Sequence, residues 1–376
     1  MNYDLAHRDD ASLLHVAFTT FRIGVLILTL AKLSQAQPAS VTQALQKTME
    51  CKSTPAQTSN HETRIPSPYD RPYQPLPWVT VKDVLWALYL YPGRLLSRIP
   101  TLLNLSLNIA GPVVQMLSAP RKDELLQRFA AALGPEKPPS VFVDIARKYI
   151  ANDIRRVGDD LLLERTNANI RCISFRGREH LDGALADGKG VLLVGLHWFA
   201  ERAAMRFLTE TGYPVMSVRH QEPPDKDMGR LGRRFFQPKY ISFLHNVIRD
   251  EVFLGDRECA LKILGRLRCG GIVSILLDAP FSQQLVELPF LGQTRDIPTG
   301  AIHLIRISGC TVLPMLALGH ARALKILIER PLTFDRSLPN EEFCQAYLPP
   351  LIDILESHVR KYPDQWDCWT KPWKKP

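Results

Sequence analysis

One stretch decides the fold of this 376-residue chain: Gly190-Val191-Leu192-Leu193-Val194-Gly195-Leu196-His197-Trp198-Phe199-Ala200-Glu201-Arg202. The run from 191 to 196 is short, apolar and contains β-branched residues, which indicates a buried strand. A helical pattern begins near Glu201, so His197 lies at the carboxyl end of the strand. In open α/β sheets, ligands bind in the crevice beyond such strand ends. The pattern therefore predicts an imidazole at a ligand-binding edge of a sheet.

Strands and helices alternate on both sides of this stretch. Helical patterns at about 121–133 and 140–163 come first. The expected strands are 191–196, 214–219, 271–278, 286–291, 311–318 and 323–329, and the expected helices between and after them lie near 201–211, 227–237, 258–268, 299–308 and 342–361. This alternation predicts an α/β fold, a three-layer sandwich with a largely parallel central sheet.

His197 and Glu201 are the candidate catalytic pair. A His with a carboxylate one helical turn further on can act as a general base with its orienting acid. The alternative is a His that only fills the corner between a strand and a helix, which is the commoner case in an arbitrary protein.

Several blocks around His197 resemble, in order and spacing, the lipid A biosynthesis acyltransferases, the lauroyl/myristoyl-type branch of the lysophospholipid acyltransferase superfamily. The resemblance runs from about Ile170 to the C-terminus. Its blocks are Arg171-Cys172-Ile173-Ser174-Phe175-Arg176-Gly177, Gly188-Lys189-Gly190 with the strand to His197, Leu277-Asp278, Leu288-Pro289-Phe290-Leu291-Gly292, Pro298-Thr299-Gly300-Ala301, Val312-Leu313-Pro314, and Tyr362-Pro363-Asp364-Gln365-Trp366 with Trp369 and Lys371.

This resemblance implies a transferase of lipid biosynthesis. The family moves a fatty acyl group from acyl carrier protein or coenzyme A to a hydroxyl of a lipid A-like glycolipid or another lipid acceptor. His197 would be the base, and the acyl thioester is a co-substrate, so no cofactor is expected. The implied partners are a membrane lipid acceptor, the acyl carrier and the membrane surface, at the cytoplasmic face of the bacterial inner membrane.

The chain departs from the family at the acid of the motif. The family has His, four residues and then Asp or Glu, but here Arg202 takes that position and Glu201 comes one residue early. Two alternatives follow: an impaired homologue that binds lipid or acyl carrier without chemistry, and an acyltransferase that acts on a non-lipid A acceptor. Two further pairs have the family spacing, His220 with Asp225 and His245 with Asp250, and both are interpreted as chance matches.

Two arginines are candidate ligands for a phosphate of the donor or acceptor. Arg219 ends the strand 214–219, where the family carries an Arg, and Arg234 follows Arg230 and Arg233 in a helical run. Arg binds phosphate in a bidentate manner. For the helical run, a solvated basic face is an equally good interpretation.

Three further positions are predicted to bind substrate, each with a structural alternative. Asp278 ends the strand 271–278, where an acid often caps the next turn. Thr299 and Gly300 open a helix, whose N-terminus can receive an anion, although Thr299 can act there as a simple N-cap.

Composition limits the classes of partner. The net charge of +9 and pI near 9.2 favour an anionic surface or substrate. No nucleic-acid motif accompanies the charge, so no nucleic-acid partner is expected. The seven Cys form no CxxC pair, and the His and Cys spacing predicts no metal site.

The N-terminal third differs from the rest. Residues 1–75 are predicted to be a disordered or leader-like extension, because 37–75 are rich in Pro, Ser, Thr and Gln. Residues 76–118 contain apolar, aromatic stretches broken by Pro, typical of amphipathic helices in a membrane interface. Residues 119–376 are predicted to form the acyltransferase domain.

Overall fold

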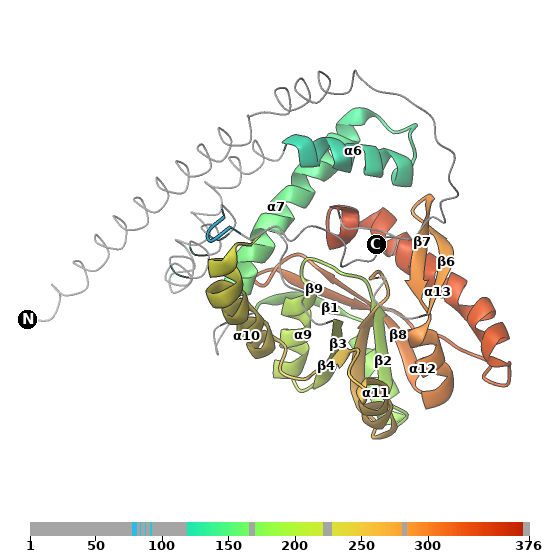
Figure 1. Ribbon diagram of the computed structural model, residues 1–376. Helices are drawn as coiled ribbons and strands as arrows, with labels where there is room; N and C mark the ends of the chain where they lie inside the picture. Colours follow the sequence, from blue (N-terminus) through green and yellow to red (C-terminus); the bar gives the residue numbers. More distant parts are fainter. Residues whose placement is uncertain are drawn as a thin grey trace, which may run out of the picture. The chain divides into compact units, whose positions relative to one another are not determined.

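Figure 1 shows the computed structural model, which describes residues 77–80, 83, 87, 91, 119–164, 170–220, 228–279 and 284–370. The chain divides into two compact units. The smaller holds Met1–Leu96 with Pro224–Tyr240, and the larger holds Ser97–Pro223 with Ile241–Pro376. The predicted extension 1–75 lies outside the described residues, as does most of the predicted interfacial segment 76–118. No helix in the described part is long and apolar enough to cross a membrane.

The larger unit is built on a seven-stranded sheet with the order β1-β9-β8-β2-β5-β3-β4. Five neighbouring strands, β8 to β4 in that order, are parallel, whereas β9 is antiparallel to β8 and β1 is parallel to β9. The strands are β1 (Cys172–Arg176), β2 (Val191–Gly195), β3 (Val215–His220), β4 (Glu251–Leu254), β5 (Ile272–Leu276), β8 (Thr311–Leu318) and β9 (Leu324–Ile328). The largely parallel sheet predicted from the sequence is confirmed.

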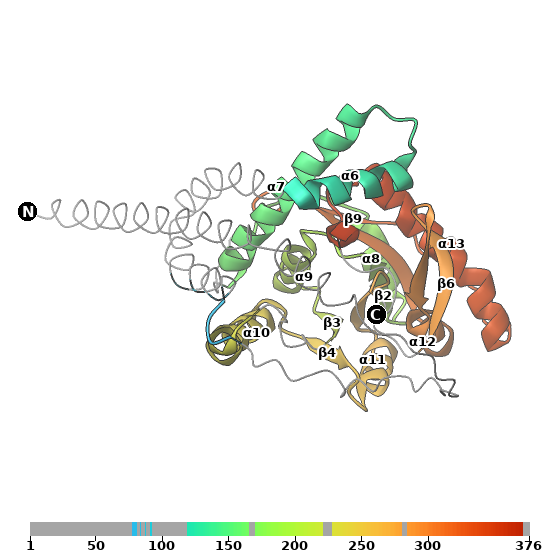
Figure 2. The same cartoon turned by 45° about the horizontal axis from the view of Figure 1, so that its top comes forward.

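Helices cover both faces of this sheet. The α-helices whose bounds the structure describes are α6 (Ala119–Leu133), α7 (Pro139–Leu163), α8 (Arg178–Ala186), α9 (Glu201–Glu210), α10 (Gln237–Val247), α11 (Cys259–Arg268), α12 (Gly300–Ser308) and α13 (Asn340–Lys361). The connection through α9 runs from β2 outward to β3, and that through α11 runs back from β4 to β5. Right-handed crossovers in opposite directions place their helices on opposite faces. Figure 2 shows α8 and α9 on one side of the strands and α11 and α12 on the other.

The central strand β2 is buried along its whole length, as its apolar sequence predicts. Gly190 leads into it with a φ of 76°, in the left-handed region. A Cβ at this position would lie 2.1 Å from the carbonyl oxygen of Leu267, so no larger residue fits here.

The strand predicted at 286–291 lies outside the central sheet. It forms β6 (Leu285–Phe290), which pairs antiparallel with β7 (Gln293–Pro298) in a separate two-stranded sheet. The sequence pattern also missed β1, β4, β7 and α8, and it ended near 237 the helical run that continues as α10. The strands β1 and β4 occupy the two edges of the sheet, and all their residues except Val252 are half-buried or exposed. Short, half-exposed edge strands carry little hydrophobic periodicity, which is why the pattern does not reveal them.

The described residues of the smaller unit are joined by one buried carboxylate. Asp83 accepts hydrogen bonds from the backbone N–H groups of Thr80 (2.6 Å) and Gly229 (3.1 Å). The backbone N–H of Arg230 also donates to the carbonyl of Pro77 (3.0 Å). Residues 224–240 therefore group with the N-terminal segment, whereas the sequence pattern assigned them to the α/β domain. Their helical run contains a π-helical turn, Gly232–Phe236.

Candidate active site

Two adjacent parallel strands bring His197 and Asp278 together. In the ladder of β2 and β5, Gly195 pairs with Leu276. Two residues further on, each strand has delivered a polar side chain to the same edge of the sheet: His197 after β2 and Asp278 after β5. This edge is the carboxyl end of the parallel strands, where α/β proteins bind ligands.

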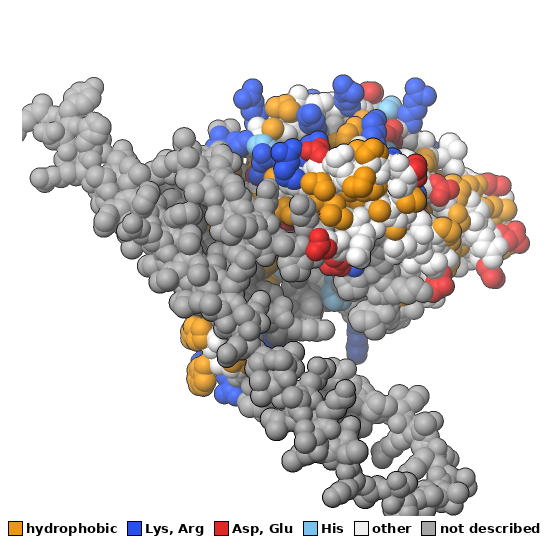
Figure 3. Space-filling model, turned by 90° about the horizontal axis from the view of Figure 1, so that it is seen from above, with side chains coloured by type: hydrophobic (Ala, Val, Ile, Leu, Met, Phe, Trp, Pro, Cys, Tyr) orange, Lys and Arg blue, Asp and Glu red, His pale blue; other side chains and the backbone are white. Residues whose placement is uncertain are grey.

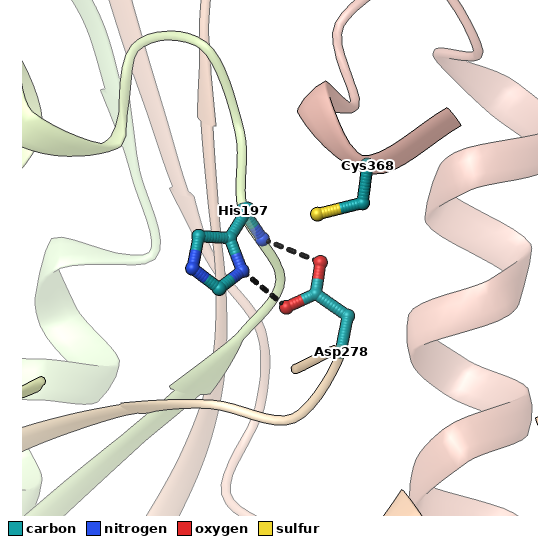
Figure 4. Close-up of side chains that lie close together, drawn as sticks. All are labelled: His197, Asp278 and Cys368. Atoms are coloured by element: carbon teal, nitrogen blue, oxygen red, sulfur yellow. Dashed lines mark hydrogen bonds and ion pairs between the residues drawn. The ribbon is translucent and has the colours of Figure 1, made fainter. Parts of the chain in front are cut away.

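Asp278 contacts His197 at two points (Figure 4). Its Oδ1 lies 2.5 Å from Nδ1 of the imidazole, and its Oδ2 accepts the backbone N–H of His197 at 2.8 Å. An ionised carboxylate only accepts hydrogen bonds, so Nδ1 carries the proton. The lone pair of the neutral ring is then on Nε2. Figure 4 shows Nε2 pointing away from Asp278.

Exposure separates the two side chains. The His197 side chain is 33% exposed, whereas that of Asp278 is 1% exposed. Burial opposes the charge on His197, but Asp278 and, to a smaller extent, Cys368 offset it and raise the pKa of His197 well above its ordinary value. Burial likewise opposes ionisation of Asp278, but His197 and Arg295 hold the pKa of Asp278 below its ordinary value. The pair is therefore a partly open base on a buried, ionised acid.

Two buried side chains donate hydrogen bonds to Asp278 and fix its position. Trp366 donates its indole N–H to Oδ2 at 2.7 Å, and Arg295 donates Nη2 to the backbone carbonyl at 2.6 Å. The Arg295 guanidinium also lies over the rings of Phe290 and Trp366, at 5.4 and 5.2 Å from their centroids. The sequence pattern did not single out Arg295. The only signal was its place in the polar strand between two family blocks.

The segment around Trp366 pairs with the chain that follows His197. Trp366 forms an isolated antiparallel bridge with Trp198, and the N–H of Asp367 donates to the carbonyl of His197 at 2.8 Å. A short 3₁₀ helix, Asp367–Thr370, comes next. These contacts bring the C-terminal segment of the family resemblance into the site.

Cys368 completes the group around the pair. Its Sγ and the ligand atoms of His197 and Asp278 lie within 4.8 Å of one another, a compact set of residue types that can bind metal ions. Both oxygens of Asp278 already accept hydrogen bonds, so an ion here would have to displace the proton on Nδ1. Figure 4 shows the Cys368 sulfur on the Asp278 side of the ring, and His197 interacts with this thiol in addition to Asp278.

A comparison of the sequence with known protein families identifies the group to which the chain is similar. The model of the bacterial lipid A biosynthesis acyltransferases matches residues 156–375, more than half of the chain. The chain belongs to this family. No match is found among the curated proteins. The resemblance predicted from the sequence blocks is confirmed, and with it an acyltransferase of the lipid A type.

Within this acyltransferase, the acid on Nδ1 is Asp278, and the structure does not bring Glu201 to that position. Glu201 is the first residue of α9, and in the described part of the chain its side chain forms no hydrogen bond to His197. Arg202, at the usual acid position of the family motif, forms an ion pair of 2.7 Å with Asp160 of α7. A catalytic part for Glu201 stays a prediction.

Arg219 lies near the carboxyl end of β3, as predicted, but a carboxylate already binds it. Its Nη1 donates to Oε2 of Glu251 at 2.8 Å, and Oε1 of Glu251 contacts Nδ1 of His245. His245 therefore pairs with Glu251 and not with Asp250, which agrees with the interpretation of its family-like spacing as chance. A phosphate would have to compete with Glu251 for Arg219.

The second predicted phosphate ligand, Arg234, belongs to the smaller unit. It lies in the π-helical turn with its guanidinium 5.7 Å from the ring centroid of Phe235. Arg230 of the same unit lies over Trp78 at the same distance. Asp225, the predicted chance partner of His220, is outside the described residues.

Thr299 and Gly300 open α12, as predicted, but Thr299 does not cap it through its side chain. Thr299 occupies the N-cap position without a side-chain capping bond, and its hydroxyl faces the carbonyl of Gln284 at 3.5 Å. The space beside Gly300 is open, with no atom within 4 Å of a Cβ built there. The binding roles predicted for these two residues stay predictions.

Proposed function

We propose that this acyltransferase moves a fatty acyl group from an acyl thioester to a hydroxyl of a lipid A-like glycolipid, with His197 as general base and Asp278 as the acid that orients it. One observation carries the proposal: the carboxylate of Asp278 binds Nδ1 at 2.5 Å and leaves Nε2 pointing away from it. Family membership supports the reaction class.

The reaction needs two proton transfers, one from the acceptor hydroxyl to His197 and one from His197 to the leaving thiolate. Nε2 of His197 takes the proton of the acceptor hydroxyl while the oxygen attacks the thioester carbonyl carbon. The buried carboxylate of Asp278 stabilises the imidazolium that results. The carbon–sulfur bond then breaks, and the imidazolium returns the proton to the leaving thiolate. A base positioned in this way typically contributes about 10²- to 10⁴-fold to the rate.

The proposed donor is acyl carrier protein or coenzyme A, and both are anionic. The net charge of +9 supports an anionic partner. Figure 3 shows Lys and Arg side chains gathered along one edge of the face in view, beside apolar side chains. A surface of this kind also suits phospholipid headgroups.

We also propose that the protein acts at the cytoplasmic face of the bacterial inner membrane, as a peripheral or monotopic protein. The support is the acceptor class of the family and the apolar, Pro-broken sequence of residues 76–118. Deletion of residues 1–118 should move the protein from floating with anionic vesicles to the soluble fraction. Undiminished flotation of the truncated protein would assign attachment to the α/β unit.

The test of the reaction is the variant His197→Ala. It is assayed with acyl carrier protein that carries a radiolabelled acyl chain, and with a lipid A precursor as acceptor. Transfer should fall by about 10²-fold or more, because only the base is lost. The matched control is His303→Ala, which removes an exposed imidazole on α12 that pairs with Asn340. Both variants should keep the wild-type circular dichroism spectrum. Wild-type transfer by His197→Ala would exclude His197 as the base.

Two alternatives give different results in the same assay. A binding protein without chemistry would retain the donor and transfer nothing. The position of Asp278 speaks against a binding protein without chemistry, because Asp278 supplies the acid that is missing at position 202 of the motif. An acyltransferase with a non-lipid A acceptor would leave lipid A unchanged and acylate another lipid, which mass spectrometry of membrane lipids with and without the gene would identify.

A further inference from the structure

We infer that Trp366 is a positioning residue for the reaction, through the hydrogen bond of its indole N–H to Oδ2 of Asp278. This inference rests on the proposed roles of His197 and Asp278. Trp366 touches neither Nε2 nor any reacting atom in the proposed mechanism, so it acts through the carboxylate alone.

The bond fixes which oxygen of Asp278 faces the imidazole. Oδ2 receives two donors, the indole N–H of Trp366 at 2.7 Å and the backbone N–H of His197 at 2.8 Å. Oδ1 is thereby left to Nδ1 of His197 at 2.5 Å. Indole has a single donor and no acceptor, so Trp366 can only donate to this oxygen. Rotation of the carboxylate would cost both bonds to Oδ2.

The indole is itself held in place from three sides. Its ring packs edge to face against Phe290 at 5.6 Å and Trp369 at 5.0 Å, and the Arg295 guanidinium lies over it at 5.2 Å. The residue is fully buried. A donor that cannot turn away keeps the acceptor in one orientation, which is what a general base needs from its partner acid.

The backbone around Trp366 is tied to the strand end that carries the base. The N–H of Phe199 donates to the carbonyl of Gln365 at 3.1 Å, and the N–H of Asp367 donates to the carbonyl of His197 at 2.8 Å. Tyr149 of α7 donates its hydroxyl to the carbonyl of Asp367 at 3.0 Å. The base and the donor to its acid therefore share one hydrogen-bonded frame.

The chain offers a matched pair of variants, Trp366→Phe and Trp369→Phe. Trp369 is also fully buried, and its indole N–H donates at 2.7 Å to the carbonyl of Pro363 and not to Asp278. Each variant loses one indole N–H and the same volume. Only Trp366→Phe should change the chemistry at the pair.

For Trp366→Phe, kcat should fall by about tenfold or more, the size expected for one hydrogen bond to a charged group, while KM stays unchanged. Without the donor, the carboxylate concentrates more charge on the Nδ1 proton, so the acid limb of kcat/KM should move to higher pH. Trp369→Phe keeps an aromatic ring beside Trp366 and leaves the indole N–H of Trp366 on Asp278, so it should leave the acid limb in its wild-type place. An unmoved limb in Trp366→Phe, or an equal shift in both variants, would overturn the inference.

Two further measurements extend the test. One replaces Trp366 by a residue of the same shape, in case Trp366→Phe does not fold, and the other follows His197 without substrate. If Trp366→Phe does not fold, benzothienylalanine at position 366 keeps the bicyclic shape and replaces the N–H with sulfur, and the same shift is expected. The titration of His197, followed by NMR of Cε1-labelled histidine and assigned with His197→Ala, needs no substrate. A shifted titration with no loss of transfer would uphold the positioning and refute the proposed function. An unshifted titration would refute the positioning whatever the activity.

Discussion

Asp278 binds His197 through both carboxylate oxygens, one on the ring nitrogen Nδ1 at 2.5 Å and one on the backbone N–H at 2.8 Å. The two bonds together fix the rotation of the ring and the nitrogen that carries the proton. They also tie the base to the strand next to its own, across 81 residues of sequence. The acid that binds His197 therefore comes from the neighbouring strand of the sheet, and not from the helix α9 that follows the motif.

Asp278→Asn should lower kcat by about 10²-fold or more, because a neutral amide cannot stabilise the imidazolium. It should also move the acid limb of kcat/KM to lower pH. The sign follows from the effects on His197: burial lowers its pKa, whereas Asp278 and then Cys368 raise it, so the variant loses the larger of the two raising effects. The measurement is the pH dependence of transfer, with the exposed Asp256→Asn as control. An acid limb at the wild-type pH in both variants would refute the pairing.

Glu201→Gln separates the sequence hypothesis from the structure. If Glu201 oriented the imidazole, Glu201→Gln would lower kcat as much as Asp278→Asn does. The structure predicts a change in kcat within about threefold, because Glu201 only adds an acid to the first turn of α9, a contribution of about 0.3–1 kcal/mol to stability. Steady-state kinetics of the two variants side by side decide the matter. Equal losses in the two variants would restore Glu201 to the mechanism.

The sequence revealed His197 but ranked its partner too low, for a physical reason. Position 197 is defined by a contiguous pattern of a buried strand and an amphipathic helix, which local periodicity reveals. The place of Asp278 beside it depends on β2 and β5 being neighbours in the sheet, which no local pattern encodes. An Asp at a strand end is usually a cap, so the sequence predicts for Asp278 a contact with substrate or a structural cap, and not the acid that orients His197.

The same reason explains Arg295 and Trp366. A buried Arg in a polar hairpin strand and a Trp near the C-terminus gave no sign of a common neighbour. Their contacts with Asp278 span 17 and 88 residues. In contrast, β2, β3, β5, β8 and β9 were all predicted, because the buried apolar residues of these strands carry their own signal.

Arg202→Glu should destabilise the fold, although it restores an acid at the usual spacing of the family motif. Arg202 pairs with Asp160, whose side chain is 5% exposed, and the variant would place a second carboxylate beside it. Removal of one partner of a buried pair costs about 3 kcal/mol or more. Urea unfolding should show this loss of free energy. The control is Arg147→Glu, which breaks an exposed pair with Asp144 and should cost under about 1 kcal/mol.

Adding Asp160→Asn to Arg202→Glu should recover part of the loss, because one carboxylate then remains where two would repel each other. If Arg202→Glu unfolds at the same urea concentration as Arg147→Glu, the ion pair to Asp160 does not contribute to stability. If it is stable and also transfers faster than the wild type, the family spacing of the acid matters more than the position of Asp278.

Asp159→Asn should stabilise the protein at neutral and alkaline pH. Asp159 is buried, and burial raises its pKa from 3.8 to about 7. Between these two pH values the unfolded chain releases the proton while the folded one keeps it, so stability falls as pH rises. Asn cannot ionise, and its side-chain oxygen can still accept the backbone N–H of Ala321. The gain should approach about 4 kcal/mol at pH 8, three pKa units at 1.36 kcal/mol each, and disappear near pH 4. Urea unfolding at the two pH values measures it, with the exposed Asp353→Asn as control. An equal difference from wild type at pH 4 and pH 8 would show that Asp159 does not titrate in this range.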